Sequence, residues 1–180
     1  MYLSSLSGDW LPVAKHVFAV PVPVVWNPGA EQIKAGYATI APFLKKTALL
    51  IVNKDEAIEL VLTGIKVGRK NHSYLNKPAY LLNVLKEWCP GIVMVTDGHR
   101  GAYAHDGAKL YFEKARKVTV HDTTGVGDAF AAGVVAGLYD LRLSVQQALL
   151  CGIVNSASVA TKVGAQEGLL NRSSLQSKLL

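Results

Sequence analysis

One stretch of the sequence decides how the chain is interpreted: Asp122-Thr123-Thr124-Gly125-Val126-Gly127-Asp128. The two glycines allow the backbone to turn tightly and to approach a ligand closely. Residues 129–138 have a helical and largely apolar composition, so the glycines lie where a loop enters a helix. A helix start offers unpaired N–H groups and the positive end of the helix dipole, and both favour a phosphate. The stretch therefore predicts an anion-binding loop formed by Gly125, Val126 and Gly127.

Asp128 falls in the first turn of this predicted helix. A carboxylate beside a bound phosphate is repelled by it, unless the carboxylate acts on a proton or a metal. In phosphoryl transfer the protein mainly positions charged groups, and one base orients or deprotonates the nucleophile. Asp128 has the residue type and the position of that base. The alternative is that the glycines form a plain turn and Asp128 is a favourable helix-start charge, worth roughly 0.3–1 kcal/mol.

The complete stretch closely resembles the second signature of the ribokinase family, the PfkB-type carbohydrate kinases. The resemblance implies that Asp128 is the catalytic base. It implies that the N–H groups of Gly125, Val126 and Gly127 form the anion hole for the transferred phosphoryl group. It also implies ATP and Mg²⁺ as cofactors, and an alcohol group of a sugar or related small molecule as the phosphoryl acceptor.

Short apolar strands alternate with helices along the chain, and this alternation predicts a mainly parallel sheet covered on both faces. We expect strands at 2–3, 22–26, 48–52, 92–95 and 117–120, and a hairpin over 102–112. We expect helices at 8–19, 31–46, 55–62, 79–88, 128–139 and 145–162, with a kink or break at Pro42, and a polar loop at 71–76. Ligands of such sheets lie at the carboxyl ends of the strands. The loops after Val52, Val95 and Val120 should therefore open onto one edge.

A length of 180 residues predicts one domain, spanning 1–180. The family resemblance implies a ribokinase-like fold with three layers, α/β/α. It covers only the second half of a family member. We therefore expect a partial domain that carries the nucleotide and catalytic side, without the N-terminal part of the sheet and without the β-lid. Whether the chain is active alone is left open.

Two polar residues, Asn53 and Glu56, follow the second buried strand. They resemble the Asn-x-x-Glu element of the family, which implies a role around magnesium and phosphate, partly through water. Magnesium prefers oxygen ligands and keeps several waters, so a carboxylate and an amide suit its outer shell. The same spacing is that of a capping box, in which Asn53 begins a helix and Glu56 is its third residue. Both interpretations can hold together.

A glycine-containing loop, Thr96-Asp97-Gly98-His99-Arg100-Gly101, follows the strand that ends at Val95. It resembles the family's Thr-x-Gly-x-x-Gly nucleotide loop, which implies nucleotide contacts from Thr96, Gly98 and Gly101. The alternative is a plain turn between a strand and a hairpin.

The resemblance extends to three further positions. It implies that Asp122 and Thr124 help to hold a monovalent cation such as K⁺, together with carbonyl groups of residues 163–167. Gly164 matches the glycine of the Gly-Ala that closes the nucleotide site. Relatives often carry His or Asn eleven residues before that glycine, whereas this chain has Ile153. The sequence therefore predicts no particular side-chain contact to adenine, and it leaves open which residue, if any, binds a metal directly.

Composition limits the class of protein, its partners and its cellular compartment. The formal charge is +6 and half the residues are hydrophobic, which is typical of a globular chain. Lysine and arginine are scattered without interleaved aromatic residues, which disfavours nucleic acid as a partner. No apolar run reaches the roughly 18–20 residues of a membrane span. Two isolated cysteines, Cys89 and Cys151, indicate a reducing compartment, the cytoplasm.

A second hypothesis for the function is a non-catalytic nucleotide-binding or subunit-interaction module. It follows from the expected cut edge of the sheet, which invites self-association or a covering partner.

Overall fold

The computed structural model of the chain describes residues 1–66 and 73–179. The chain forms two compact units: unit 1 is Met1–Thr96 with Ala104–Leu110, and unit 2 is Asp97–Tyr103 with Tyr111–Leu180. Of the polar loop expected at 71–76, the first two residues lie outside the described residues. The rest, Ser73–Asn76, form a 3₁₀ helix, η1, instead of an open loop.

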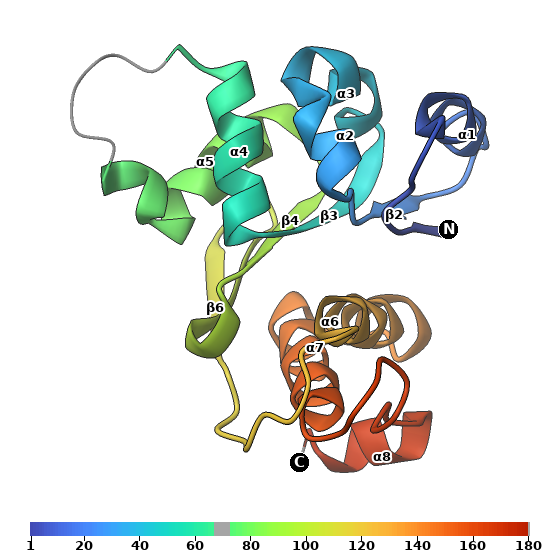
Figure 1. The fold of residues 1–180 in the computed structure, drawn as a ribbon, viewed down its shortest axis with the longest axis vertical. Coiled ribbons are helices and arrows are strands. Elements are labelled where there is room, and N and C mark those ends of the chain that lie inside the picture. The colour runs from blue at the N-terminus through green and yellow to red at the C-terminus, as the bar shows by residue number, and fades with distance from the viewer. Residues whose placement is uncertain (67–72, 180) are drawn as a thin grey trace. The chain divides into compact units, whose positions relative to one another are not determined.

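The described residues contain one sheet of six strands in the order β1-β2-β3-β4-β5-β6 (Figure 1). The strands are β1 (Tyr2–Leu3), β2 (Val24–Trp26), β3 (Thr47–Asn53), β4 (Ile92–Thr96), β5 (Gly101–His105) and β6 (Leu110–Lys114). Strands β1 to β4 pair in parallel, and β5 and β6 form the hairpin expected around residues 106–107. The prediction of a mainly parallel sheet is confirmed.

The parallel strands form the core of unit 1 because their apolar residues are continuous, as expected for a sheet covered on both faces. The side chains of Leu49, Leu50 and Val52 are completely buried. In the register between β3 and β4, Leu49 pairs with Ile92 and Asn53 with Thr96. The two polar residues that end these strands are therefore direct neighbours at the carboxyl edge of the sheet.

The helices of unit 1 mostly confirm the expected ranges. They are α1 (Trp10–Val17), α2 (Ala30–Lys34), α3 (Gly36–Leu44), α4 (Lys54–Gly64) and α5 (Pro78–Trp88). Helices α3, α4 and α5 contact β3 or β4. The expected break at Pro42 is wrong, because Pro42 lies inside α3 and the break falls at Gly36. Gly36 has a φ of +78°, which reverses the chain between α2 and α3.

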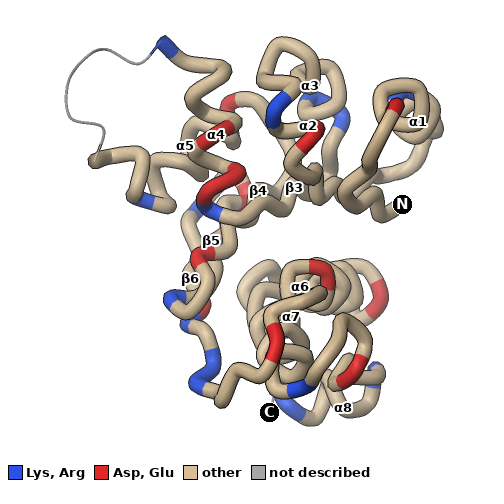
Figure 2. The backbone as a smooth tube through the Cα atoms, viewed as in Figure 1, with Lys and Arg blue, Asp and Glu red and all other residues tan. Residues whose placement is uncertain are grey.

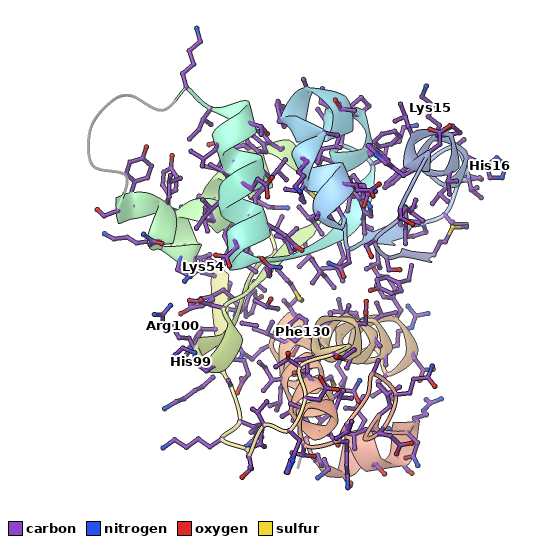
Figure 3. All side chains as sticks on the ribbon, viewed as in Figure 1. Lys15, His16, Lys54, His99, Arg100 and Phe130 are labelled. Atoms are coloured by element: carbon purple, nitrogen blue, oxygen red, sulfur yellow. The ribbon has the colours of Figure 1, made fainter. Side chains whose placement is uncertain are left out.

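The helical part of unit 2 consists of η2 (Gly98–Arg100), α6 (Val126–Val135), the π-helical turn η3 (Ala136–Asp140), α7 (Val145–Ala160) and α8 (Arg172–Ser177). Helices α6 and α7 pack along each other (Figure 1). Phe130 of α6 is buried against α7, where Gly152 leaves room for its ring (Figure 3). Helix α8 was not expected from the sequence. Among the described helices, none is long and apolar enough to cross a membrane.

The strand expected at 117–120 is absent from the structure. Its β-branched residues, Val118, Thr119 and Val120, favour extended backbone, but a strand needs a hydrogen-bonded neighbour. Val118 and Val120 are 39% and 58% exposed, and the chain is next held by the bond from the His121 N–H to the Ala160 carbonyl, at 2.8 Å. The loops after β3 and β4 follow strand ends as predicted. The loop at Asp122–Asp128 follows an unpaired segment instead.

Candidate active site

The start of α6 has the geometry of an anion-binding loop. Gly125 is the N-cap with φ +73°, and α6 begins at Val126. The carbonyl of Gly125 accepts the N–H of Ala129 at 2.8 Å, and Val126 N lies 3.3 Å from the Thr123 carbonyl. Within the described part of the chain, no hydrogen bond involves the N–H groups of Gly127 and Asp128. Two donors at the positive end of a ten-residue helix are thus available to an anion.

The fold requires a glycine at only one of the two glycine positions in this loop. A Cβ at Gly125 would lie 2.6 Å from the Cβ of Ala165, and the positive φ is itself unfavourable for other residues. A Cβ at Gly127 would meet no atom within 4 Å. The fold therefore requires Gly125, whereas nothing in the described protein requires Gly127.

Asp122 fixes the loop to a turn 42 residues later in the sequence. Its Oδ1 accepts the N–H and the hydroxyl of Thr124, at 2.9 and 2.8 Å, and its Oδ2 accepts the N–H of Gly164 at 2.8 Å. These donors, with the Thr124 N–H first, lower the pKa of Asp122 from 3.8 to about 2. Three of the predicted site residues, Asp122, Thr124 and Gly164, are thus joined by hydrogen bonds.

The lowered pKa of Asp122 predicts a pH-dependent stability. Because the carboxylate is favoured in the folded state, its contribution is present above the unfolded pKa and is lost as the pH falls from about 4 toward 2. Asp122→Asn should lower the urea midpoint at pH 6, and its difference from the wild type should shrink toward pH 2.5. Asp9→Asn is a control at an exposed helix start without a side-chain capping bond. Parallel curves for Asp122→Asn and wild type would contradict the assignment.

Asp128 lies in the first turn of α6, as predicted, and its side chain is exposed. Within the described residues, no hydrogen bond or ion pair involves its carboxylate. The carboxylate is thus available at the same helix start as the two unpaired N–H groups.

In unit 1, the capping box expected from the sequence is present at the start of α4. The Glu56 N–H is bound by Asn53 Oδ1, and the Asn53 N–H by Glu56 Oε2, both at 2.8 Å. The pKa of Glu56 is raised, mainly because partial burial disfavours the charged carboxylate. The hydrogen bond from the Asn53 N–H has the opposite, smaller effect and lowers the pKa. Thr96 of β4 pairs with Asn53 of β3, and Asn53 is hydrogen-bonded to Glu56. The predicted residues Asn53, Glu56 and Thr96 therefore lie together at the carboxyl ends of β3 and β4.

The loop after β4 contains η2. Gly101 has a φ of +128°, and a Cβ there would lie 2.1 Å from the carbonyl oxygen of Glu113, so hairpin packing requires this glycine. Arg100, expected to be able to reach a phosphate, forms an ion pair with Asp97 at 3.2 Å within its own turn. Figure 3 labels His99 and Arg100 on this turn.

Unit 2 contains a cavity of about 630 Å³ that the anion-binding loop lines in part. Thr123 and Val126 line the cavity at the loop, and Gly98 and His99 line it from η2. Its remaining walls are the segment between β6 and α6 and one face of α7, with Lys114, Ala115, Arg116, Lys117, Val118, Val120, Ile153, Ser156, Ala157 and Ala160. Of the predicted nucleotide residues, Gly98 lines this cavity, whereas Gly101 and Gly164 do not.

Three basic residues in this lining, Lys114, Arg116 and Lys117, are missing from the sequence-based site. They are exposed: Lys114 ends β6, and Arg116 and Lys117 lie on the segment that follows it, where Figure 2 shows blue stretches. The sequence signal was available, because three cations fall within four positions directly before the anion-binding loop. Of the three, only Lys117 falls in the strand that the sequence predicts at 117–120.

Asn155 of α7 has a structural role. It is 4% exposed, its Nδ2 donates to the Ala129 carbonyl at 2.7 Å, and its Oδ1 accepts the Leu170 N–H at 3.0 Å. Its amide therefore joins α6 to the segment before α8. Ile153 and Ser156 line the cavity from the same helix.

A mainly parallel sheet with a glycine-containing loop entering a helix defines an α/β protein with a helix start suited to phosphate. The sequence profile of the pfkB family carbohydrate kinases matches residues 18–172. The chain therefore belongs to the pfkB family of carbohydrate kinases, as the resemblance at Asp122–Asp128 indicated.

Three relatives illustrate the match. A ribokinase of Lactococcus lactis subsp. lactis is 35% identical over 99 residues, covering 55% of this chain and 32% of the relative. A fructokinase of Salmonella thompson is 34% identical over 144 residues, covering 73% and 65%. The crystal structure of a putative ribokinase II from E. coli in complex with ATP and Mg²⁺ superposes with a TM-score of 0.70 and 19% identity, covering 91% and 50%. The ribokinase-like fold is confirmed, and the chain spans between about a third and two thirds of each relative's length.

Proposed function

We propose that this chain supplies the nucleotide-binding and catalytic side of an ATP-dependent kinase that phosphorylates an alcohol group of a sugar or related small molecule. The observation that carries the proposal is the start of α6, where unpaired N–H groups and an exposed carboxylate adjoin. Membership of a carbohydrate kinase family supports it. In the reaction, the acceptor oxygen bonds to the γ-phosphorus of ATP, and the bond from that phosphorus to the ADP oxygen breaks.

Two groups at the helix start would perform this step. The unpaired N–H groups of Gly127 and Asp128, with the turn at Gly125, hold the phosphoryl oxygens, on which negative charge is spread during transfer. The N–H of Val126, which the sequence placed in the anion hole, instead donates to the Thr123 carbonyl at 3.3 Å. Asp128 accepts the proton that the acceptor hydroxyl loses, so the proton moves from the substrate oxygen to a carboxylate oxygen. Gly98 and the cations Lys114, Arg116 and Lys117 support nucleotide binding from the cavity walls. We assign a supporting role to Thr96, Gly101 and Gly164, whose backbone shapes the loops that we propose bind the nucleotide.

The oxygen groups of Asn53 and Glu56 fit Mg²⁺ bound through water. The capping box uses Glu56 Oε2, so the other carboxylate oxygen is available to a hydrated cation. When bound, Mg²⁺ neutralises charge on the phosphate oxygens of ATP.

We expect Glu56→Gln to raise the Mg²⁺ concentration needed for half-maximal nucleotide binding or turnover. Glutamine at the third helical position preserves the capping box, so stability should change little. Asp55→Asn, an exposed change in the same turn, is the matched control. A Mg²⁺ titration of ATP binding checks the effect. If the Glu56→Gln curve overlays the wild-type curve, Asn53 and Glu56 serve α4 alone.

We also propose a monovalent cation such as K⁺ near Asp122 and Thr124. Asp122 Oδ1 already accepts two hydrogen bonds and Oδ2 accepts one, so an oxygen lone pair is left on Oδ2. Carbonyl groups of residues 163–167 belong to the turn that Asp122 binds. Comparison of ATP binding in K⁺ and in tetramethylammonium tests this assignment.

Location and partners form part of the proposal. Cys89 and Cys151 are free and buried, which fits a reducing compartment, and we propose the cytoplasm. Strand β1 is an edge of the described sheet, and edge strands offer unpaired backbone groups. We propose that a second copy or another partner covers this edge, which light scattering of the purified chain tests.

Phosphoryl transfer by the purified chain tests the proposed function. If the chain also supplies a working acceptor site, ³¹P NMR with ATP, Mg²⁺ and a panel of sugars and nucleosides should show ADP together with a new phosphomonoester. ATP binding without transfer to any acceptor would support a non-catalytic nucleotide-binding module. Absence of ATP binding would overturn the kinase and the nucleotide-binding module, and would leave a subunit-interaction module.

A further inference from the structure

The cavity at the anion-binding loop has a defined direction. Thr123 and Val126 line it from the anion-binding loop, whose unpaired N–H groups hold the phosphates in the proposed function. The nucleoside part must then extend toward α7 and the segment after β6. These walls carry Val118, Ile153 and Ala157, which suit the flat faces of a base.

Thr123 lies on the anion-binding loop, and His99 of η2 has an imidazole that, when neutral, carries one donor and one acceptor nitrogen and so favours neither purine. The other polar side chains of the cavity walls are of two kinds. Lys114, Arg116 and Lys117 can only donate hydrogen bonds. Ser156 donates its hydroxyl proton to the Ile153 carbonyl at 3.1 Å, so toward the cavity it offers an acceptor. No carboxylate or carboxamide belongs to the lining residues in the described part of the chain, and the nearby Asn155 amide is committed to Ala129 and Leu170.

Both adenine and guanine can form a hydrogen bond with one of these side chains. The 6-amino group of adenine donates a hydrogen bond, which the Ser156 oxygen can accept. The O6 and N7 atoms of guanine accept hydrogen bonds, which lysine and arginine side chains supply well. A site discriminates strongly between two purines only when the wrong purine leaves a polar group of the protein buried without a hydrogen-bond partner. Exposed lysine and arginine side chains remain hydrated, so the wrong purine costs them little.

We propose, on the basis of the proposed function, that this donor cavity accepts guanine as well as adenine nucleotides, and that Ser156 sets the balance between them. Its hydroxyl oxygen favours adenine, and the cations of the segment after β6 favour guanine. The relative affinity for the two purines then depends on a single neutral hydrogen bond at α7.

Direct binding of MgATP and MgGTP to the full chain, by calorimetry, tests the proposal. Wild-type dissociation constants should agree within about tenfold. Ser156→Ala should weaken ATP by roughly 2- to 10-fold, the usual net value of one neutral hydrogen bond, and leave GTP nearly unchanged. Ser177→Ala is the matched control: the exposed Ser177 of α8 makes the same kind of bond, from its hydroxyl to the Ser174 carbonyl at 3.0 Å, and does not line this cavity, so neither affinity should change.

The outcomes separate this inference from the proposed function. A preference of a hundredfold or more for either purine, or a Ser156→Ala variant with an unchanged ratio of ATP to GTP affinity, overturns the inference while ATP binding stands. Failure of both nucleotides to bind overturns the proposed function itself. Because Ser156 lies at a helix surface and its substitution by alanine favours helix, folding should not limit the test.

Discussion

Asp128→Asn should reduce phosphoryl transfer by about 10²-fold or more and leave the ATP dissociation constant within about threefold of the wild type. Asparagine retains the size and the first-turn position of the side chain, but it cannot accept the proton of the acceptor hydroxyl. Because the carboxylate makes no hydrogen bond to other described residues, the change should not disturb the fold. Single-turnover ADP formation and calorimetric ATP binding measure the two quantities.

Asp140→Asn is the matched control for this prediction. Asp140 lies at the end of η3 and forms an exposed ion pair with Arg172 at 3.3 Å, so the same chemical change removes a surface charge. Its turnover should remain near the wild-type value. Near-native turnover of Asp128→Asn would remove Asp128 from the mechanism and leave it as a helix-start charge.

Gly127→Ala and Gly125→Ala should separate ligand binding from stability. The methyl group at position 127 meets open space, so the fold should keep its stability or gain up to about 1 kcal/mol from better helix propensity. A phosphate held against the backbone there would meet that methyl group, and ATP affinity should fall by about tenfold or more. Gly125→Ala should instead destabilise the protein by at least about 1–2 kcal/mol, since its backbone is left-handed and Ala165 blocks the Cβ.

Urea unfolding and ATP binding, measured on both variants, check this pair. Unchanged ATP affinity in a stable Gly127→Ala variant would contradict the anion-hole assignment. Loss of stability in both variants would mean that the whole turn is structural.

The sequence predicted features whose cause is local. Continuous apolar runs determined β3 and β4, because strands buried on both faces need no polar side chains. Asn53 and Glu56 predicted the start of α4, since a capping box is formed within one turn. The glycine pair predicted the start of α6, with Asp128 in its first turn.

Features that depend on distant partners escaped prediction. Residues 117–120 have the composition of a strand, but no neighbouring strand pairs with them, and a single sequence does not reveal that. Asn155 binds Ala129 and Leu170, which lie 26 and 15 residues away, so its structural role is visible only in three dimensions. The cationic part of the cavity was missed because its lining forms only where the end of β6, η2 and α7, which are distant in sequence, come together.

The hydrogen bond from the Gly164 N–H to Asp122 has a practical consequence for solution studies. The amide of Gly164 belongs to the turn after α7, yet its protection from solvent exchange depends on a carboxylate that precedes α6. Its exchange rate and its NMR chemical shift thus report on the phosphate-facing loop without any label attached there. Nucleotide that orders the loop should slow exchange at Gly164, and acidification toward the pKa of Asp122 should speed it relative to other amides.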